Sequence, residues 1–299
     1  MTQTAPRGLM VLALALVCAS AWSCGEGETL PAYGDVDPRQ TDTEQEEPIA
    51  FSTTPYTVQG PASMAELYAL FPSPADVVVW QGFEADSPYP VSPDCQPDRN
   101  TPYTPVTLPE LPKTIEGIIT LHPRLYQKRA ICDNDERFYG SFIIQDATAG
   151  IVVLRDSRLT TFTYGDRVRL RVRGLMLNAF PNGGPFYTVQ LFDQVEVIER
   201  AQPIYYEALE REFTNADIGL VKRVRGKIVL MPDNNNFGEM ELADPDDPSV
   251  TWFASLDSEL SKRRPEFKLG DTLEITGPVL DNFGLRIMIA SFGQITKVQ

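Results

Sequence analysis

From Lys113 to the end of the chain, short runs alternate apolar and polar residues and are separated by turn-forming residues. Alternation with a period of two is typical of strands that place one face in a core. The runs occur twice in the same order, which predicts an internal repeat. The first copy comprises Ile115–Thr120, Ser141–Asp146, Ile151–Leu154, Tyr164–Gly174 and Thr188–Ile198. The second copy comprises Val224–Val229, Glu239–Asp244, Val250–Phe253, Leu269–Gly277 and Leu285–Val298.

Each copy predicts five strands, and a Gly-Asp pair opens the fourth strand in both, at Gly165-Asp166 and Gly270-Asp271. Five short strands with glycines at the bends are the outline of an OB-fold barrel. Between the copies, Ile204–Phe213 has apolar residues at helical spacing. The predicted fold class is therefore mainly β, with tandem five-stranded OB-like barrels joined by a short helix and preceded by a proline-rich N-terminal extension.

The N-terminal extension, residues 51–112, contains many prolines, which interrupt any long helix or strand. We expect an ordered, loop-rich segment packed on the first barrel. Ser63 followed three residues later by Glu66 predicts a capped short helix within it. The predicted boundaries are 1–23 for a signal peptide, 24–50 for a tether, 51–112 for this segment, 113–200 for the first barrel, 201–219 for the linker helix and 220–299 for the second barrel.

One stretch of the first copy resembles a known family. The string FIIQDATAGIVVLRD, followed by YGDRVRLRVRGL, is similar to an OB-like domain of unknown function found in bacterial surface lipoproteins. Gln145–Ile151 and the Gly165-Asp166 turn carry the resemblance, which covers Lys113–Glu199. The second copy departs from it, since Asp244 is followed by Pro-Asp-Asp-Pro. The resemblance implies a fold and a location but no activity.

The N-terminus has the order of a secretory signal peptide: a cation at Arg7, an apolar run over Leu9–Val17, and small residues before Cys24. It resembles a bacterial lipoprotein signal, which implies that Cys24 becomes the lipidated first residue of the mature protein. Since residue 25 is not aspartate, the resemblance implies retention at the outer membrane. The alternative is cleavage by the general signal peptidase near Ala19–Ala21. Gly25–Ala50 is acidic and poor in apolar residues, so we expect a disordered tether.

The charge and cysteine content narrow the function classes. The chain carries 26 Lys and Arg against 41 Asp and Glu, a net charge of −15, which disfavours long-range attraction to nucleic acid or anionic lipid. Outside the signal region, Cys95 and Cys132 form an even pair that export would allow to join in a disulfide; two separate thiols are the alternative. The sequence has one histidine and no Cys-x-x-Cys pair, so it predicts no zinc site and no cofactor.

OB-folds usually bind ligands with strands two and three and with the loops before strands two and five. In the first copy these loops combine cations and aromatic residues, which could contact a backbone and stack on bases or sugars. The candidate ligand-binding residues are Arg124, Tyr126, Lys128, Arg129, Arg137, Phe180, Phe186 and Tyr187. The alternative is a long loop packed by its own aromatic residues.

A stripe of arginines lies on one face of the fourth strand, at residues 167, 169, 171 and 173. It could bind an anionic ligand, or it could be an outer face neutralised by the carboxylates of this acidic chain. Asp233–Gly238 begins like a calcium loop but has phenylalanine at a ligand position, so a hairpin turn is favoured. No Gly-x-Ser-x-Gly motif is present to suggest a serine hydrolase.

These observations predict a non-catalytic, envelope-anchored binding module that presents the loop surface of an OB barrel to a protein or glycan. The first alternative is an extracytoplasmic binder of single-stranded nucleic acid, accessory to a nuclease. The second alternative is an uncharacterised hydrolase. Contact with the membrane is expected through the lipid anchor only.

Overall fold

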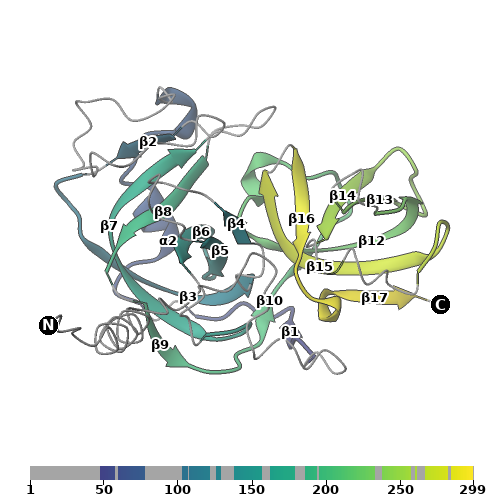
Figure 1. The fold of residues 1–299 in the computed structure, drawn as a ribbon, viewed down its shortest axis with the longest axis horizontal. Helices are drawn as coiled ribbons and strands as arrows, with labels where there is room; N and C mark the ends of the chain where they lie inside the picture. Colours follow the sequence, from purple (N-terminus) through teal and green to yellow (C-terminus); the bar gives the residue numbers. More distant parts are fainter. Residues whose placement is uncertain are drawn as a thin grey trace, which may run out of the picture. The chain divides into compact units, whose positions relative to one another are not determined.

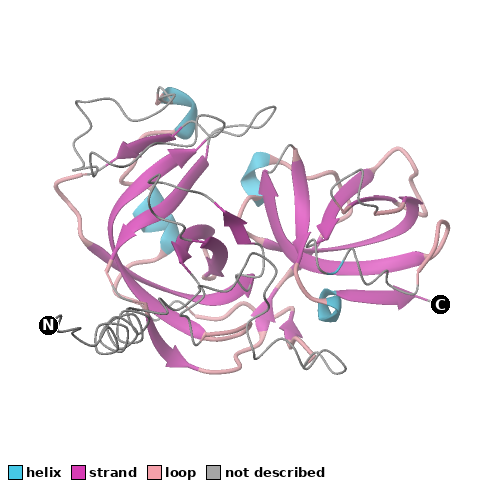
Figure 2. Cartoon of the chain, viewed as in Figure 1, coloured by secondary structure: helices cyan, strands magenta, loops and turns pink. Residues whose placement is uncertain are grey.

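The structure is a computed structural model, and its strands dominate the cartoon (Figure 2). It describes residues 48–57, 60–77, 103–106, 108–121, 126–128, 138–156, 162–178, 186–193, 195–232, 238–256, 260, 267–281 and 284–298. The predicted signal peptide, Cys24, almost all of the tether, and the pair Cys95 and Cys132 lie outside these residues. No helix within the described ranges is long and apolar enough to cross a membrane.

The first repeat folds into a closed barrel (Figure 1). Its five main strands are β3 (Lys113–Leu121), β5 (Phe138–Gln145), β6 (Gly150–Asp156), β7 (Arg167–Asn178) and β8 (Phe186–Phe192). β3 pairs antiparallel with β5 and β7, β5 pairs with β6, and the parallel pairing of β6 with β8 closes the circuit because β8 also pairs with β7. Three short strands extend this sheet: β2 (Tyr103–Val106) and β9 (Glu196–Glu199) beside β7, and β4 (Tyr126–Lys128) beside β5.

The second repeat forms a barrel with the same circuit. Its main strands are β12 (Val221–Leu230), β13 (Glu239–Ala243), β14 (Thr251–Leu256), β15 (Thr272–Asp281) and β16 (Leu285–Ile289). β12 pairs with β13 and β15, β13 with β14, β14 with β16 in parallel, and β15 with β16. A 3-10 turn, η5 (Phe292–Gln294), leads to β17 (Ile295–Val298), which pairs with β15. The predicted fold class of tandem five-stranded barrels is confirmed.

Each barrel has its own apolar core, as the alternating pattern requires. The first is built around Ile115, Phe142, Ile144 and Leu170, and the second around Trp252, Leu242, Ile275 and Ile287. The indole of Trp252 donates to the carbonyl of Arg211 at 2.7 Å, so the one polar atom of this ring is satisfied inside the core.

The Gly-Asp pair makes the same turn in both barrels. Gly165 and Gly270 have φ of +77° and +87°, a conformation that glycine adopts without strain. Their amides donate to Ile119 and Ile228, and Asp166 and Asp271 accept from backbone amides at 3.1 and 3.0 Å. The sequence repeat is therefore a repeat of geometry.

The described part of the N-terminal extension packs on the first barrel. Helix α2 (Met64–Tyr68) begins at Ser63 with the capping box that the sequence predicts, since Ser63 and Glu66 bond reciprocally. Met64 and Leu67 have no exposed surface and belong to the core of the first barrel. The chain then makes the 3-10 turn η3 (Pro74–Asp76).

The predicted linker helix over Ile204–Phe213 is wrong. The segment forms two short strands instead, β10 (Ile204–Tyr205) and β11 (Glu207–Ala208), followed by a 3-10 turn, η4 (Asn215–Asp217). β10 pairs in parallel with β1 (Phe51–Ser52), and β11 pairs in parallel with β12. Backbone partners from other parts of the chain outweigh the local helical spacing, and the β-branched and aromatic residues at its start also suit strands.

Candidate functional site: an uncharged pocket beside the first barrel

The structure places only some of the predicted ligand-binding residues. Arg124, Arg129, Arg137 and Phe180 lie outside the described residues, as do Asp233–Phe237 of the calcium-like loop. Tyr126 and Lys128 are the ends of β4.

Phe186 and Tyr187 begin β8 and are only 7% and 4% exposed. They are not open stacking platforms on the outer surface. The hydroxyl of Tyr187 donates to the carbonyl of Pro72 at 2.8 Å, and its ring centroid lies 5.4 Å from that of Phe71.

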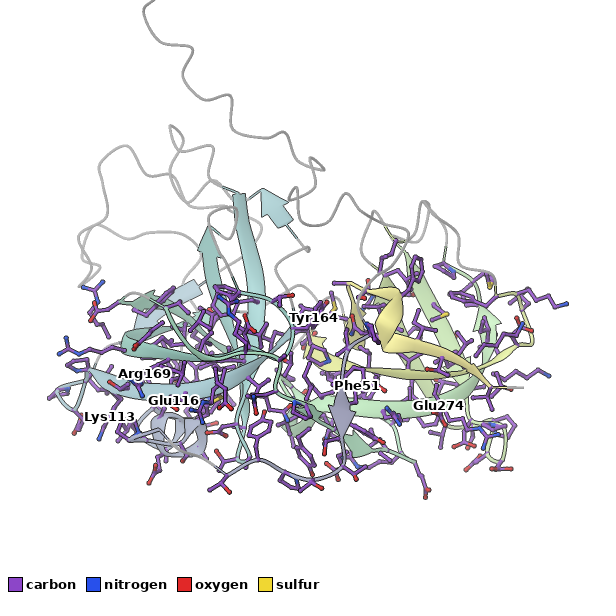
Figure 3. The ribbon with its side chains drawn as sticks, turned by 90° about the horizontal axis from the view of Figure 1, so that it is seen from below. Phe51, Lys113, Glu116, Tyr164, Arg169 and Glu274 are labelled. Atoms are coloured by element: carbon purple, nitrogen blue, oxygen red, sulfur yellow. The ribbon has the colours of Figure 1, made fainter. Side chains whose placement is uncertain are left out.

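The arginine stripe on β7 is neutralised by the chain itself. Glu116, 4% exposed, lies 2.6 Å from Arg169 and 3.8 Å from Arg167, and Figure 3 shows Glu116 beside Arg169. Arg171 and Arg173 share Asp193 at 3.3 and 3.2 Å. Each of the four arginines thus has a carboxylate partner, as the alternative of a neutralised outer face predicts, while the side chains of Arg171 and Arg173 are 58% and 59% exposed.

The motif over Gln145–Gly150 lies where the two barrels meet. The side-chain oxygen of Gln145 accepts from the amide of Val221 at 2.6 Å, and its amide group donates to the carbonyl of Tyr205 at 3.2 Å. The hydroxyl of Tyr56 donates to the backbone carbonyl of Gln145. One buried glutamine therefore joins the first barrel to β1's segment, to the linker and to the first residue of the second barrel.

Gly150 is in backbone contact with Gly219 of the linker. A Cβ atom on Gly150 would lie 1.9 Å from the carbonyl oxygen of Gly219, so no larger residue fits. Apolar side chains add to the junction: Phe186, Leu121 and Val152 of the first barrel pack in one cluster with Met288 and Ala290 of the second.

Asp146 of the same motif organises the turn after β5 and the start of α2. Its Oδ1 accepts from the amides of Thr148 and Ala149 at 2.7 and 2.9 Å, and its Oδ2 accepts from the amide of Met64 at 2.7 Å. The hydroxyl of Thr148 accepts from the amide of Ala65 at 3.1 Å. The motif that gave the family resemblance thus has a structural role, since Asp146 and Thr148 bind the start of α2 while Gln145 binds the linker and the second barrel.

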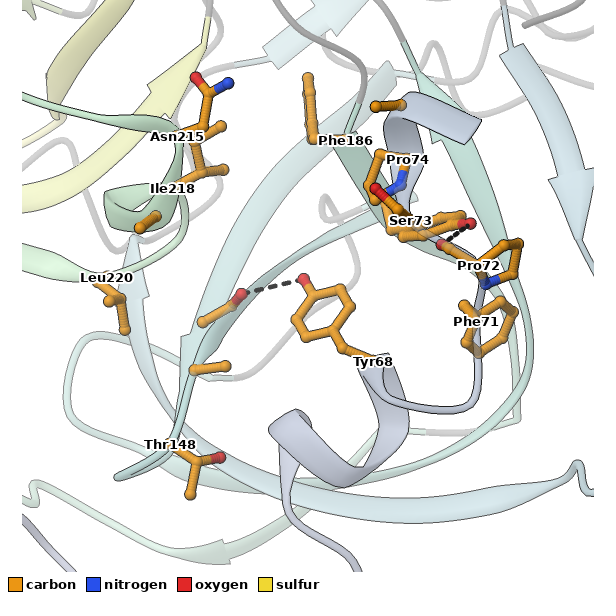
Figure 4. Close-up of a pocket in the computed structure, with 15 residues that line it drawn as sticks. Tyr68, Phe71, Pro72, Ser73, Pro74, Thr148, Phe186, Asn215, Ile218 and Leu220 are labelled. Carbon is orange, nitrogen blue, oxygen red and sulfur yellow. Dashed lines mark hydrogen bonds between the residues drawn. The ribbon is translucent and has the colours of Figure 1, made fainter. Parts of the chain in front are cut away.

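A pocket of about 570 Å³ lies beside this motif (Figure 4). Its walls come from three parts of the chain: residues 68–75 of the N-terminal extension, strands β6 and β8 with the turn before β6, and the linker around η4. The lining residues are Tyr68, Phe71, Pro72, Ser73, Pro74, Ala75, Thr148, Ala149, Gly150, Phe186, Tyr187, Asn215, Ala216, Ile218 and Leu220. Pro72, Ser73, Ala75, Asn215 and Ala216 are exposed, so the pocket can be reached from the surface.

The described lining of the pocket has no charged group. None of the described residues that line it carries a carboxylate, imidazole, thiol, amine or guanidinium group. Its two tyrosines stay protonated: burial, and then the charge of Asp146, raises the pKa of Tyr68, and burial raises the pKa of Tyr187. Both hydroxyls donate to backbone carbonyls, that of Tyr68 to Gly150 at 3.1 Å.

A buried ion cluster fixes the linker wall of the pocket. Asp217, the last residue of η4, is 1% exposed and accepts two hydrogen bonds from Arg211 at 2.7 and 3.0 Å. Lys222, 2% exposed, lies 3.2 Å from Asp217 and 2.5 Å from Glu207. Burial alone would raise the pKa of Asp217, but the hydrogen bonds from Arg211, Thr214 and Lys222 hold it well below its usual value.

Sequence reasoning found Phe186 and Tyr187 but assigned them to an exposed loop, and it missed the rest of the pocket. Ser63 and Glu66 mark the helix that leads to one wall, yet nothing in the local sequence says that residues 68–75 would face Ala216 and Ile218. Among the described residues, no group of three His, Cys, Asp or Glu side chains could hold a metal ion.

Comparison with known proteins adds no family. No protein-family model matches the chain, and no curated protein matches it. Solved structures with weak likeness include the tetrameric p202 HIN2, at 8% identity and a TM-score of 0.28, covering 63% of this chain and 94% of that chain. The Ifi202 HINa domain in complex with 20-bp dsDNA matches at 10% identity and a TM-score of 0.30, covering 65% and 97%. We draw nothing about function from likeness at these TM-scores.

Proposed function

We propose that this chain is a non-catalytic binding module of the bacterial envelope, and that its pocket takes an apolar group of a protein partner. The observation that carries the proposal is the surface-accessible pocket, whose described lining has no charged group and consists mainly of aromatic, proline and aliphatic residues, with Ser73, Thr148 and Asn215 as its polar members. Its volume of about 570 Å³ is in the range of ligand pockets. Partner proteins commonly anchor on such a pocket with one aromatic or aliphatic side chain.

The chemistry of the pocket favours binding over catalysis. Hydrolysis needs a nucleophile with a base, or an acid–base pair, at the reacting atoms. The described lining supplies two tyrosines with raised pKa values, one serine and one threonine, and the threonine hydroxyl already donates to Asp146 at 2.6 Å. The pocket therefore offers shape and apolar surface to a ligand.

The same lining favours a protein partner over a glycan or a nucleic acid. Sugars need several free hydrogen-bonding groups, whereas the Tyr68 and Tyr187 hydroxyls are engaged with backbone carbonyls, and Ser73 and Asn215 add one exposed hydroxyl and one exposed amide to the described lining. Phosphates need cations, and the arginines of β7 are paired with Glu116 and Asp193.

The location is part of the proposal. A lipid on Cys24 would hold the body at the outer membrane through the acidic segment Gly25–Ala50. The carbonyl of Ala50, the last residue of this segment, accepts a hydrogen bond from the amide of Ile204 at 2.8 Å.

The test is a pair of titrations on one chain, with Nile red as an uncharged apolar probe and with labelled single-stranded DNA. Ala216→Trp fills the pocket from η4, and Leu269→Trp adds the same ring to an apolar residue of the second barrel that is 61% exposed. We expect Nile red binding that Ala216→Trp removes and Leu269→Trp leaves intact, with no DNA binding. DNA binding that weakens steeply with salt, or Nile red binding unaffected by Ala216→Trp, would refute the proposal.

A further inference from the structure

One wall of the pocket is a segment that is not part of either barrel. Residues 60–77, here called the docking segment, contain α2 and η3 and supply the lining from Tyr68 to Ala75 (Figure 4). The facing walls belong to the first barrel and to η4 of the linker. The pocket exists only while the docking segment lies on the barrel.

The docking segment is held on the first barrel by apolar packing into the barrel core and by hydrogen bonds of its backbone and side chains. Helix α2 has five residues, too few to be stable alone in water. Ala62, Met64, Leu67 and Phe71 are buried in the barrel core, and Ala62 also forms a β-bridge to Ile115. Asp146 supplies the charged attachment at the first turn of the helix, because its buried carboxylate accepts from the amide of Met64; beside it, Thr148 accepts from the amide of Ala65.

Two tyrosine hydroxyls bond the docking segment to the barrel wall of the pocket. The Tyr68 hydroxyl donates to Gly150 at 3.1 Å, and the Tyr187 hydroxyl donates to Pro72 at 2.8 Å. Figure 4 draws both bonds as dashed lines, one from Tyr68 and one beside Pro72. Undocking would break both bonds and remove the rings of Tyr68 and Phe71 from the lining.

From these contacts we propose that the pocket is a conditional site: docking of residues 60–77 and occupancy of the pocket stabilise each other. The proposal rests on the function proposed above and adds its regulation. A ligand that touches both walls favours the docked state, and by linkage the docked state binds the ligand more tightly by the same factor. Release of the docking segment therefore empties the pocket.

The variant Asp146→Asn separates the two roles of this side chain. The asparagine oxygen can still accept from Thr148 and Ala149, but its amide group cannot accept from Met64. Asp244→Asn is the matched control, because Asp244 caps the equivalent turn of the second barrel through one oxygen, with Asp246 and Asp247 as donors.

The experiment uses the exported chain carrying Cys24→Ala, which keeps every described residue and needs no detergent. Nile red affinity is measured together with amide hydrogen exchange. For Asp146→Asn we expect about tenfold weaker Nile red binding, because a charge-assisted hydrogen bond is lost. We also expect faster amide exchange over residues 60–77. Exchange in β5 and β7 should stay unchanged. Asp244→Asn should change neither binding nor exchange of the docking segment.

Each other outcome decides against a specific claim. If exchange of the docking segment becomes faster in Asp146→Asn but Nile red affinity is unchanged, the coupling is overturned and the proposed function stands. Unchanged exchange of the docking segment in Asp146→Asn has the same consequence. Absence of Nile red binding to the parent chain overturns the proposed function itself. If exchange in β5 and β7 also becomes faster in Asp146→Asn, the reciprocal measurement decides. Saturating Nile red should slow the exchange of residues 60–77 in the parent chain and should not slow it in Ala216→Trp. If the parent chain exchanges at the same rate with and without Nile red, the coupling is overturned.

Discussion

At the scale of single residues, Asp217 is the group on which the linker between the barrels depends most. It is 1% exposed and receives hydrogen bonds from Arg211 and from both the amide and the hydroxyl of Thr214. Lys222 is also buried and close to it. A buried charge is tolerated only while such partners remain in place.

Replacing Asp217 with asparagine should therefore destabilise the protein strongly. The change leaves Lys222 buried with Glu207 as its remaining anion, and breaking one partner of a buried pair costs about 3–5 kcal/mol. Urea unfolding at pH 7 measures the effect, and Asp244→Asn in an exposed turn is the control, with a cost below about 0.5 kcal/mol. Equal midpoints for the two variants would show that the cluster contributes nothing.

The same residue predicts a pH dependence. The pKa of Asp217 is lowered in the folded protein from its usual 3.8, so near that pH the unfolded chain binds more protons than the folded chain. The stability from this group is complete above pH 3.8 and is lost as the pH falls toward the folded pKa. We expect the free energy of unfolding to fall more steeply between about pH 4 and pH 2 in the parent chain than in Asp217→Asn. Parallel pH profiles would contradict this assignment.

At the scale of elements, the Gly-Asp turn shows the repeat most clearly, and its two copies differ in their surroundings. A Cβ on Gly165 would lie 2.5 Å from the carbonyl oxygen of Gln202. A Cβ on Gly270 would meet nothing closer than the Lys227 side chain at 3.6 Å. The backbone strain is shared, while the steric conflict belongs to the first barrel only.

Alanine at these two positions should therefore have unequal costs. Gly270→Ala should lower the free energy of unfolding by about 1 kcal/mol, because only the left-handed backbone is strained. Gly165→Ala adds a clash with the backbone and should lower it by about 2–4 kcal/mol. Thermal or urea unfolding of the two variants measures the difference. A larger cost at Gly270 would mean that the contact between Gly165 and Gln202 is not as described.

The elements also show how far the sequence could predict this fold. The strands, the Gly-Asp turns and the cap at Ser63 depend on residues that are close in sequence, so the sequence pattern predicts them. The helix predicted over Ile204–Phe213 failed because Phe51 and Lys222, distant in sequence, supply backbone partners for short strands there. Gln145 illustrates the same limit, since its three partners lie in three different segments.

The candidate site was only partly predictable for the same reason. Phe186 and Tyr187 were identified by residue type, but their burial depends on Phe71, Pro72 and Met288. The alternating sequence predicts that the arginines share one face of a strand. It does not predict their pairing with Glu116 and Asp193, because that depends on which strand lies beside β7 and on the turn after β8.

At the scale of the whole molecule, the location rests on Cys24. If this cysteine carries the lipid anchor, Cys24→Ala should move the protein from the membrane fraction to the soluble fraction without changing its unfolding midpoint, because the sequence predicts a disordered tether between Cys24 and the barrels. Fractionation of the producing cells with immunodetection measures this. Unchanged membrane partition of Cys24→Ala would exclude lipidation as the cause of retention.

The central claim is that the uncharged pocket binds an apolar group of a protein partner, and site-specific photo-crosslinking in the producing cells tests it most directly. A photoreactive residue replaces Ala216 in the pocket or, as control, Leu269 on the second barrel, each with and without Ala75→Trp on the facing wall. The account predicts a discrete protein adduct from position 216 that Ala75→Trp abolishes, and none from position 269. The same adducts from both positions, or an adduct from position 216 that persists with Ala75→Trp, would contradict it.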